Sequence, residues 1–256
     1  MQYMPIRVRI RRHAERPTHG EGHGGAHTPL TEAGKQHAFA LGKRLKGKQS
    51  TYFYSTPVGR SSETARQMAR GAGKPTAKIH ERADLTQFVK PHSPQEAAEV
   101  MRILTPPANE VIHDWLQGKL PPKFFHSPEE VAALAAYTMR HVPTGMGKLY
   151  QWHARAVAME KATGRRVPHR RPYINIEAIG HDITIVALLR ALTGKEPTQR
   201  NGSYADFLEH AELQFKPKRG KTPVVRLIYR NRQYDVTQKF NELVMKGRRL
   251  KAEQKI

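Results

Sequence analysis

The chain has 256 residues, of which 38% are hydrophobic and none is cysteine. This length supports one sizeable core, or a core with an inserted cap, rather than two full domains. The lack of cysteine excludes disulfides, thiolate metal sites and thiol nucleophiles, and it fits a reducing cytoplasm. No apolar run approaches the ~20 residues that span a bilayer, and no signal-peptide pattern opens the sequence. We therefore expect a soluble cytoplasmic protein without membrane insertion.

Charge is the outlying feature of the composition. Lysine and arginine number 44 against 22 acidic residues, which gives a formal charge of +22. A field of this sign attracts phosphorylated ligands, nucleic acids and anionic lipids alike. It therefore indicates a polyanionic partner without naming it, and a generally basic proteome is the alternative explanation.

The first third of the chain alternates strand and helix patterns. Thr31 precedes apolar residues at helical spacing, which is typical of a helix N-cap. The aromatic run TYFYS at 51–55 is typical of a strand. The predicted elements are a strand over 6–10, a helix after Thr31, a strand over 51–55, a helix over 61–72 and a strand over 77–80.

Residues 84–150 differ from the rest because prolines interrupt them repeatedly. Between the prolines, two runs over 94–104 and 128–141 have helical patterns. We interpret the whole stretch as an inserted helical cap. A further helix is predicted over 151–163.

The remaining chain again alternates strand and helix. The predictions are a strand over 173–179, a helix over 183–192 entered directly from it, a hairpin with strands over 224–229 and 234–236, and a basic helix or tail over 241–256. This alternation favours a single α/β domain, a three-layer sandwich around a mostly parallel sheet. In such sheets, sites gather at the carboxyl ends of strands.

Three of the predicted strands are followed by basic or imidazole side chains. The junctions read RRHAERP at 11–17, STPVGRSSETA at 55–65 and GHD at 180–182. The second and third run straight into helices, whose N-termini favour anions. Together with LTEAG at 30–34, the four segments resemble the motifs of the histidine phosphatase superfamily, which includes the cofactor-dependent phosphoglycerate mutases. The resemblance covers residues 5–80 and 173–236, but not 84–150.

The chemistry of these residues fits phosphoryl transfer. A phosphoryl group in transfer spreads negative charge over three oxygens, which the planar guanidinium groups of Arg12 and Arg60 can bind. His181 can donate a further hydrogen bond. His13 can attack phosphorus through one ring nitrogen if a backbone carbonyl holds the other. Arginine charge replaces a metal here, so we expect neither a metal nor a cofactor.

The leaving alkoxide needs a proton donor. In the acid-phosphatase branch of the superfamily, a His-Asp pair like His181-Asp182 supplies this acid. In the mutase branch, the acid is a Glu after the third strand, and Gln87 stands where that Glu is expected. The resemblance therefore favours Asp182, with Glu81 and Asp84 as weaker candidates and a helix-capping role as the alternative for Asp182.

Other features leave alternatives open. Arg16 matches a further substrate-binding arginine of the phytase-type pattern, although it can also be a solvated loop residue. A metal site at His19, His23 and His27 is disfavoured because no carboxylate or cysteine completes it. The basic run over 246–251 is either a solvated helix face or a nucleic-acid contact.

Arginines also alternate along the first predicted strand, at Arg7, Arg9 and Arg11. A parallel strand covered on both faces should be almost continuously apolar. We therefore expect either a poorly covered face or arginines that extend past small neighbours to reach water.

The predicted function is that of a phosphatase that hydrolyses a phosphomonoester through a phosphohistidine on His13. Its substrate would be a phosphorylated small molecule or a phosphoprotein, selected by the cap over 84–150. The alternatives are a phosphoglycerate mutase-like phosphotransferase and a non-catalytic module that binds phosphate or nucleic acid on the same fold.

Overall fold

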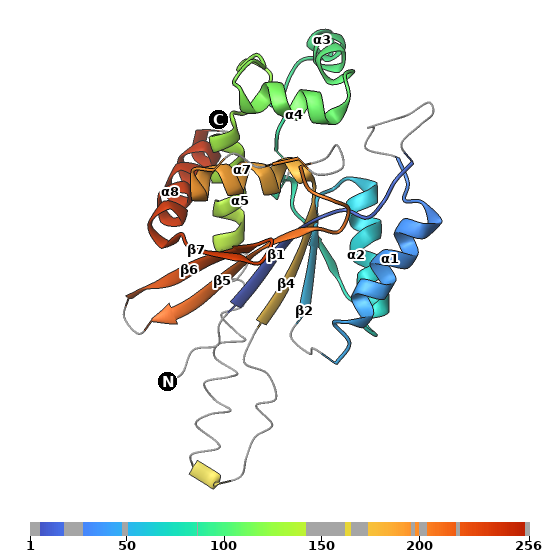
Figure 1. Cartoon of the computed structure of the whole chain (residues 1–256), viewed down its shortest axis with the longest axis vertical. Coiled ribbons are helices and arrows are strands. Elements are labelled where there is room, and N and C mark those ends of the chain that lie inside the picture. Colours follow the sequence, from blue (N-terminus) through green and yellow to red (C-terminus); the bar gives the residue numbers. More distant parts are fainter. Residues whose placement is uncertain are drawn as a thin grey trace.

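The structure is a computed structural model that places a seven-stranded sheet between helices (Figure 1). Among the described residues, no helix is long and apolar enough to cross a membrane. The predicted helix over 151–163 lies almost wholly outside the described residues. These are 6–17, 28–47, 51–85, 87–141, 162–164, 174–195, 198–199, 204–218 and 221–253.

The sheet has the strand order β3-β2-β4-β1-β5-β6-β7. The pairs β1–β4, β2–β4 and β2–β3 are parallel, whereas β1–β5, β5–β6 and β6–β7 are antiparallel. The expected α/β sandwich is confirmed, but a mostly parallel sheet is wrong, because a meander of β5, β6 and β7 extends one side. The strands are β1 (Ile6–Arg12), β2 (Thr51–Ser55), β3 (Ile79–Glu81), β4 (Ile174–Gly180), β5 (His210–Lys218), β6 (Lys221–Tyr229) and β7 (Arg232–Asp235).

The helices largely follow the predicted ranges. Helices α3 and α5 have the expected bounds, α2 begins two residues earlier than expected, and α4 was not predicted. A 3-10 turn, η1 (Ala83–Leu85), follows β3. The helices are α1 (Glu32–Lys43), α2 (Gly59–Gly71), α3 (Pro94–Leu104), α4 (Ala108–Leu116), α5 (Pro128–His141), α7 (Asp182–Thr193) and α8 (Thr237–Glu253).

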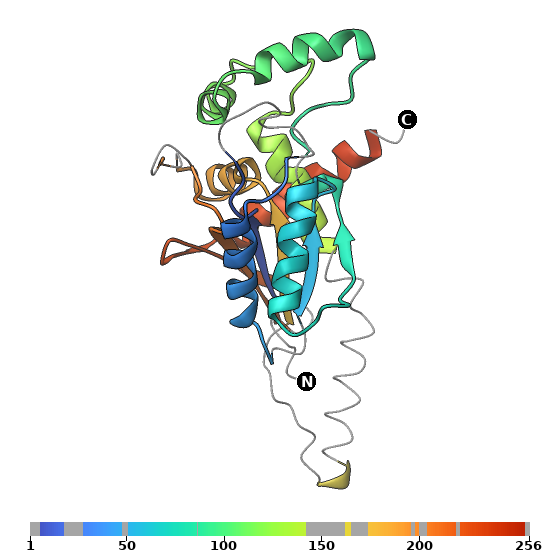
Figure 2. The same cartoon turned by 90° about the vertical axis from the view of Figure 1, so that its right-hand side faces the viewer.

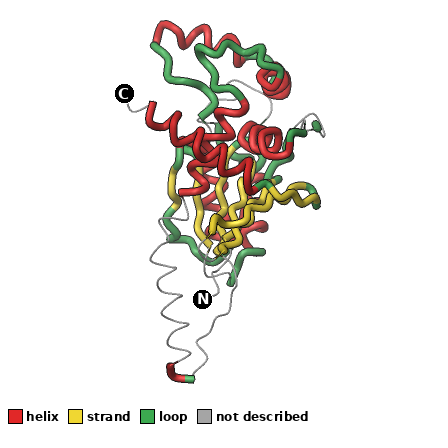
Figure 3. The backbone as a smooth tube through the Cα atoms, turned by 90° about the vertical axis from the view of Figure 1, so that its left-hand side faces the viewer, coloured by secondary structure: helices red, strands yellow, loops and turns green. Residues whose placement is uncertain are grey.

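Helices cover both faces of the sheet, with the strands between them (Figure 3). Helices α1 and α2 pack together on one face, and α5, α7 and α8 lie on the other. Helix α5 belongs to the main core, since Val131, Ala135 and Met139 are buried in it. Helices α3 and α4 lie at one end of the molecule (Figure 2). The inserted cap over 84–150 stays a prediction. The stretch contains α5, which belongs to the main core, as well as α3 and α4, which lie at one end of the molecule.

The start of α1 holds the loop that follows β1. Thr31 caps the helix, because its Oγ1 accepts from the Gly34 N–H at 2.9 Å, as predicted. The Thr31 N–H donates to the Glu15 carbonyl at 3.1 Å. A Cβ at Gly34 would overlap that same carbonyl, so only glycine permits this approach. The LTEAG segment therefore positions residues 13–17.

Three arginines of β1, Arg7, Arg9 and Arg11, lie against two carboxylates of the neighbouring strands. Arg9 bridges Glu177 of β4 at 2.9 Å and Glu212 of β5 at 2.7 Å. Arg11 pairs with the other oxygen of Glu177 at 3.1 Å, and Arg7 lies 3.7 Å from Glu212. Neither expectation for this face is right, since carboxylates on the two neighbouring strands supply the missing partners. We call these five residues the charge ladder.

Candidate active site

Three strand ends meet at one edge of the sheet. Strand β4 pairs in parallel with both β1 and β2, so the residues that follow them lie side by side. The His13 N–H donates to the Gly180 carbonyl, and the Thr56 N–H donates to the Ile179 carbonyl, each at 3.0 Å. These bonds join the segments that carry the predicted site residues.

His13 is held as a neutral imidazole with a defined tautomer. The residue is 3% exposed, and Arg60 Nε donates to its Nε2 at 3.1 Å. Because a guanidinium can only donate, Nε2 carries a lone pair, and Nδ1 carries the proton that it donates to the Ala14 carbonyl at 2.7 Å. The backbone carbonyl that the chemistry requires is therefore present, and Nε2 is the nitrogen that could attack once its hydrogen bond from Arg60 is released.

Burial and neighbouring charges keep both histidines of the site unprotonated. Burial, His181 and Arg60 hold the pKa of His13 well below its ordinary value. Burial and the cations Arg60, Arg12 and Arg16 lower the pKa of His181 to about 3. Burial also lowers the pKa of Arg60 to about 10, which leaves it charged at neutral pH. The site thus combines neutral imidazoles with excess positive charge.

Asp182 is the carboxylate that faces this cluster. It is the first residue of α7, and its Oδ1 accepts from the Ile183 N–H at 3.0 Å. Its Oδ2 lies 3.6 Å from Arg12 Nη2, and both side chains are partly open to solvent. Arg16 is near enough that Arg12 lowers its pKa and Asp182 raises it, after the larger effect of burial. All six predicted site residues are therefore neighbours.

The weaker proton-donor candidates have other partners. Asp84 pairs with Lys251 of α8 and accepts from Thr138 of α5 at 3.3 Å. Glu81 is exposed and accepts from Ser62 Oγ at 3.2 Å. Gln87 has a buried Oε1 without a hydrogen-bond partner. Among the described residues, neither Asp84 nor Glu81 forms an ion pair with an arginine of the cluster, whereas Asp182 lies 3.6 Å from Arg12.

Thr64 is a supporting residue that the sequence did not single out. Its buried Oγ1 accepts from the Ala14 N–H at 3.0 Å and donates to the Arg60 carbonyl at 2.7 Å. One hydroxyl thus fixes the loop of His13 to the helix of Arg60. The signal was available, because Thr64 lies within the STPVGRSSETA segment.

Phe207 also lies at the site but comes from a segment with no recognisable signal. Its ring is 5.9 Å from the His13 ring and 4.3 Å from the Arg12 guanidinium carbon. The next residue, Leu208, has a φ of 62°, which is unusual for a non-glycine residue. Arg11 of the charge ladder holds that turn by donating to the Leu208 carbonyl at 2.6 Å. Phe207 is thus presented to the site from a strained turn.

A metal centre finds no support in the described ranges, where no three His, Cys, Asp or Glu residues gather to hold an ion. His19, His23 and His27 lie outside the described residues. The fold and the site define an α/β protein with an anion site of histidine and arginine. Residues 8–89 match the family model described as the histidine phosphatase superfamily (branch 1). The resemblance to the histidine phosphatase superfamily is confirmed over these residues.

Solved structures give the same fold at low sequence identity. YhfR of Bacillus stearothermophilus is 17% identical, with 88% of this chain and 96% of that chain covered and a TM-score of 0.52. A mycobacterial glucosyl-3-phosphoglycerate phosphatase is 18% identical, with 89% and 99% covered and a TM-score of 0.51. Mycobacterial hydrolase 2 is 17% identical, with 94% and 97% covered and a TM-score of 0.52. The comparison with curated proteins gave no match.

Proposed function

We propose that this protein is a phosphatase that hydrolyses phosphomonoesters through a phosphohistidine on His13. The observation that carries the proposal is the tautomer of His13, whose Nδ1–H is fixed on the Ala14 carbonyl while Nε2 faces Arg60. A neutral, buried imidazole beside arginines suits attack on a phosphate dianion.

In the first step, the Nε2 lone pair of His13 forms a bond to phosphorus as the bond to the leaving oxygen breaks. Arg12, Arg16 and Arg60 hold the phosphoryl oxygens, and His181 adds a hydrogen bond when it carries a proton on the facing nitrogen. The protonated carboxyl of Asp182 gives its proton to the leaving alkoxide, so an alcohol departs.

In the second step, the Asp182 carboxylate takes a proton from water as the water oxygen bonds to phosphorus. The N–P bond breaks, its electron pair returns to Nε2, and inorganic phosphate leaves. The enzyme regains a neutral His13 and a protonated Asp182. Gln87 cannot supply a proton in either step, which favours hydrolysis with Asp182 over a mutase that uses a Glu after the third strand.

Substitution of His13 by alanine tests the nucleophile. We expect kcat/KM for an aryl phosphate to fall by at least about 10³-fold. The wild type, quenched during turnover, should carry acid-labile phosphate on His13. His37→Ala, on the exposed face of α1, is the matched control and should keep full activity. An active His13→Ala variant would overturn the proposal, and a wild type inactive on a broad phosphate panel would favour the binding module. Stimulation by a bisphosphate primer would favour the mutase.

Substitution of Asp182 by asparagine tests the proton donor. An alkyl phosphate has a poor leaving group, so its kcat should fall about 10²- to 10⁴-fold. A nitrophenyl phosphate, whose leaving group needs little protonation, should be affected much less. Glu81→Gln and Asp84→Asn are the controls, and if either reproduces this leaving-group dependence while Asp182→Asn does not, the assignment of Asp182 is wrong.

A further inference from the structure

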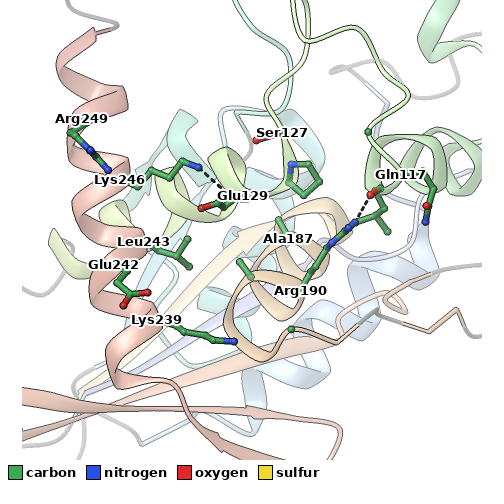
Figure 4. Close-up of a pocket in the computed structure, with 15 residues that line it drawn as sticks. Gln117, Ser127, Glu129, Ala187, Arg190, Lys239, Glu242, Leu243, Lys246 and Arg249 are labelled. Carbon is green, nitrogen blue, oxygen red and sulfur yellow. Dashed lines mark hydrogen bonds and ion pairs between the residues drawn. The ribbon is translucent and has the colours of Figure 1, made fainter.

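A second basic site lies away from His13, between helices α7 and α8. A cavity of about 860 Å³ opens between the two helices and the segment that joins α4 to α5 (Figure 4). We call it the α7–α8 pocket. Its lining includes the apolar residues Ala187, Ala191 and Leu243 together with polar and charged side chains. The pocket therefore needs an explanation separate from the catalytic site.

Positive charge dominates the lining of this pocket. Four cations, Arg190 from α7 and Lys239, Lys246 and Arg249 from α8, face two carboxylates, Glu129 and Glu242. Lys246 pairs with Glu129 at 2.9 Å, but that carboxylate is 63% exposed, so the pair contributes little to stability. Among the described residues, Lys239 and Arg249 have no ion-pair partner. The pocket thus has cationic side chains available for an anion.

The position of the pocket separates it from the phosphate site. Asp182 begins α7 at the catalytic edge, and Arg190 follows eight residues later on the same helix. At 1.5 Å per residue, the two positions are about 12 Å apart along the helix axis. The lining of the pocket contains none of the six catalytic candidates. An anion bound there would not contact His13.

The spacing of the cations selects an elongated ligand. Lys239 and Arg249 are ten residues apart on α8, which corresponds to about 15 Å along the helix axis. A single phosphate is too small to reach both ends, whereas successive phosphates of one strand can do so. None of the described lining residues is aromatic, so they offer no rings on which bases could stack.

We propose that the α7–α8 pocket binds the sugar–phosphate backbone of a single-stranded nucleic acid without reading its bases. The net charge of +22 attracts such a polyanion from a distance, and the convergent side chains of α7 and α8 define where it binds. The basic run of α8 is then part of a site rather than a solvated face. Because no residue is shared with the catalytic site, this proposal does not depend on phosphatase activity.

The test measures binding of a fluorescent single-stranded RNA to the full chain at several salt concentrations. Lys239→Gln combined with Arg249→Gln should weaken binding at least about tenfold at low salt. The slope of log K against log salt should become shallower by about 1.4, at about 0.7 for each phosphate that is no longer neutralised. Arg70→Gln combined with Arg102→Gln removes the same charge from exposed positions of α2 and α3, and this control should change the slope little.

Three results separate the alternatives. Arg60→Gln should keep RNA binding, which would exclude retention through the catalytic arginines. Inorganic polyphosphate should compete with RNA for the same residues, because both present rows of phosphates. The proposal is overturned if wild type does not bind RNA, if both double variants lose the same affinity, or if only anionic lipid vesicles bind in a Lys239- and Arg249-dependent way. Thermal melting, measured on all variants, reports folding independently of RNA binding and of the proposed phosphatase activity.

Discussion

Strand β1 contributes to two groups of arginines, which differ in the carboxylates that face them. In the charge ladder, Arg9 and Arg11 lie against Glu177 and Glu212 of the neighbouring strands. Just beyond, Arg12 reaches the catalytic edge, where Arg16 and Arg60 add positive charge and Asp182 is the facing carboxylate.

The adjacent residues Arg11 and Arg12 thus have different surroundings. Arg11 is 4% exposed and pairs with a carboxylate whose side chain is fully buried, so its charge is compensated within the protein. At the catalytic edge, Arg12, Arg16 and Arg60 gather around one carboxylate, Asp182, so cations outnumber acids among the described residues. A buried arginine with a carboxylate partner is a structural element, whereas a group of arginines with too few partners marks an anion site.

The largest expected effect comes from removing surplus charge at the catalytic edge. Arg60→Gln should lower kcat/KM about 10³-fold, because the guanidinium binds charge that grows in the transition state. Its melting temperature should change by no more than a few degrees, because burial already disfavours the charged form, as the pKa of about 10 indicates. Arg66→Gln is the control on the exposed face of the same helix. If the variant unfolds but the folded fraction keeps its activity, Arg60 has a structural role like the arginines of the charge ladder.

The converse substitution lies in the ladder. Glu177→Gln leaves Arg11 without its carboxylate partner and Arg9 with Glu212 alone, and we expect a loss of about 3–5 kcal/mol in the free energy of unfolding. Urea unfolding measures this loss, with Glu99→Gln at an exposed position of α3 as control. At low temperature, kcat/KM should fall far less than in Arg60→Gln. A change in stability below about 1 kcal/mol would show that the ladder is not a structural element.

These two groups also show how far the sequence was informative. That the candidate site residues lie together could be predicted, because each of them lies in a short local segment at a strand end. The partners of the ladder could not, since opposing Arg9 to Glu177 and Glu212 requires the strand register. Strand β5 was missed, although Ala211, Leu213 and Phe215 alternate as buried residues along it. Without β5, the antiparallel meander of β5, β6 and β7 could not be predicted.

Acid pH should lower the stability of the protein through histidines in both groups. A bound anion should restore the part of this loss that arises at the catalytic edge. His13 and His181 at the site, and His210 beside Arg11, have pKa values below the ordinary value, about 3 for His181 and about 4 for His210. Below pH ~6.5 the unfolded chain therefore binds more protons than the folded one, and stability falls by up to about 1.4 kcal/mol per pH unit for each histidine.

Thermal melting between pH 7.5 and 4.5 measures this loss. His181→Gln and His210→Gln should each flatten the pH dependence. Millimolar sulfate, whose charge is constant over this range, should restore stability in His210→Gln as in the wild type, but much less in His181→Gln. Equal rescue of both variants would mean that sulfate acts on the whole protein rather than at the site.

The smallest expected effect concerns Phe207, which links the two groups. Its ring lies on Arg12, while Arg11 holds the following turn. Phe207→Leu removes a cation–π contact of about 0.5–2 kcal/mol, so kcat/KM should fall by roughly two- to thirtyfold. Phe207→Tyr should retain activity because it keeps the ring. In an Arg12→Gln background, Phe207→Leu should have almost no further effect, since the ring acts through that guanidinium. Full additivity of the two substitutions would show instead that Phe207 contacts the substrate on its own account.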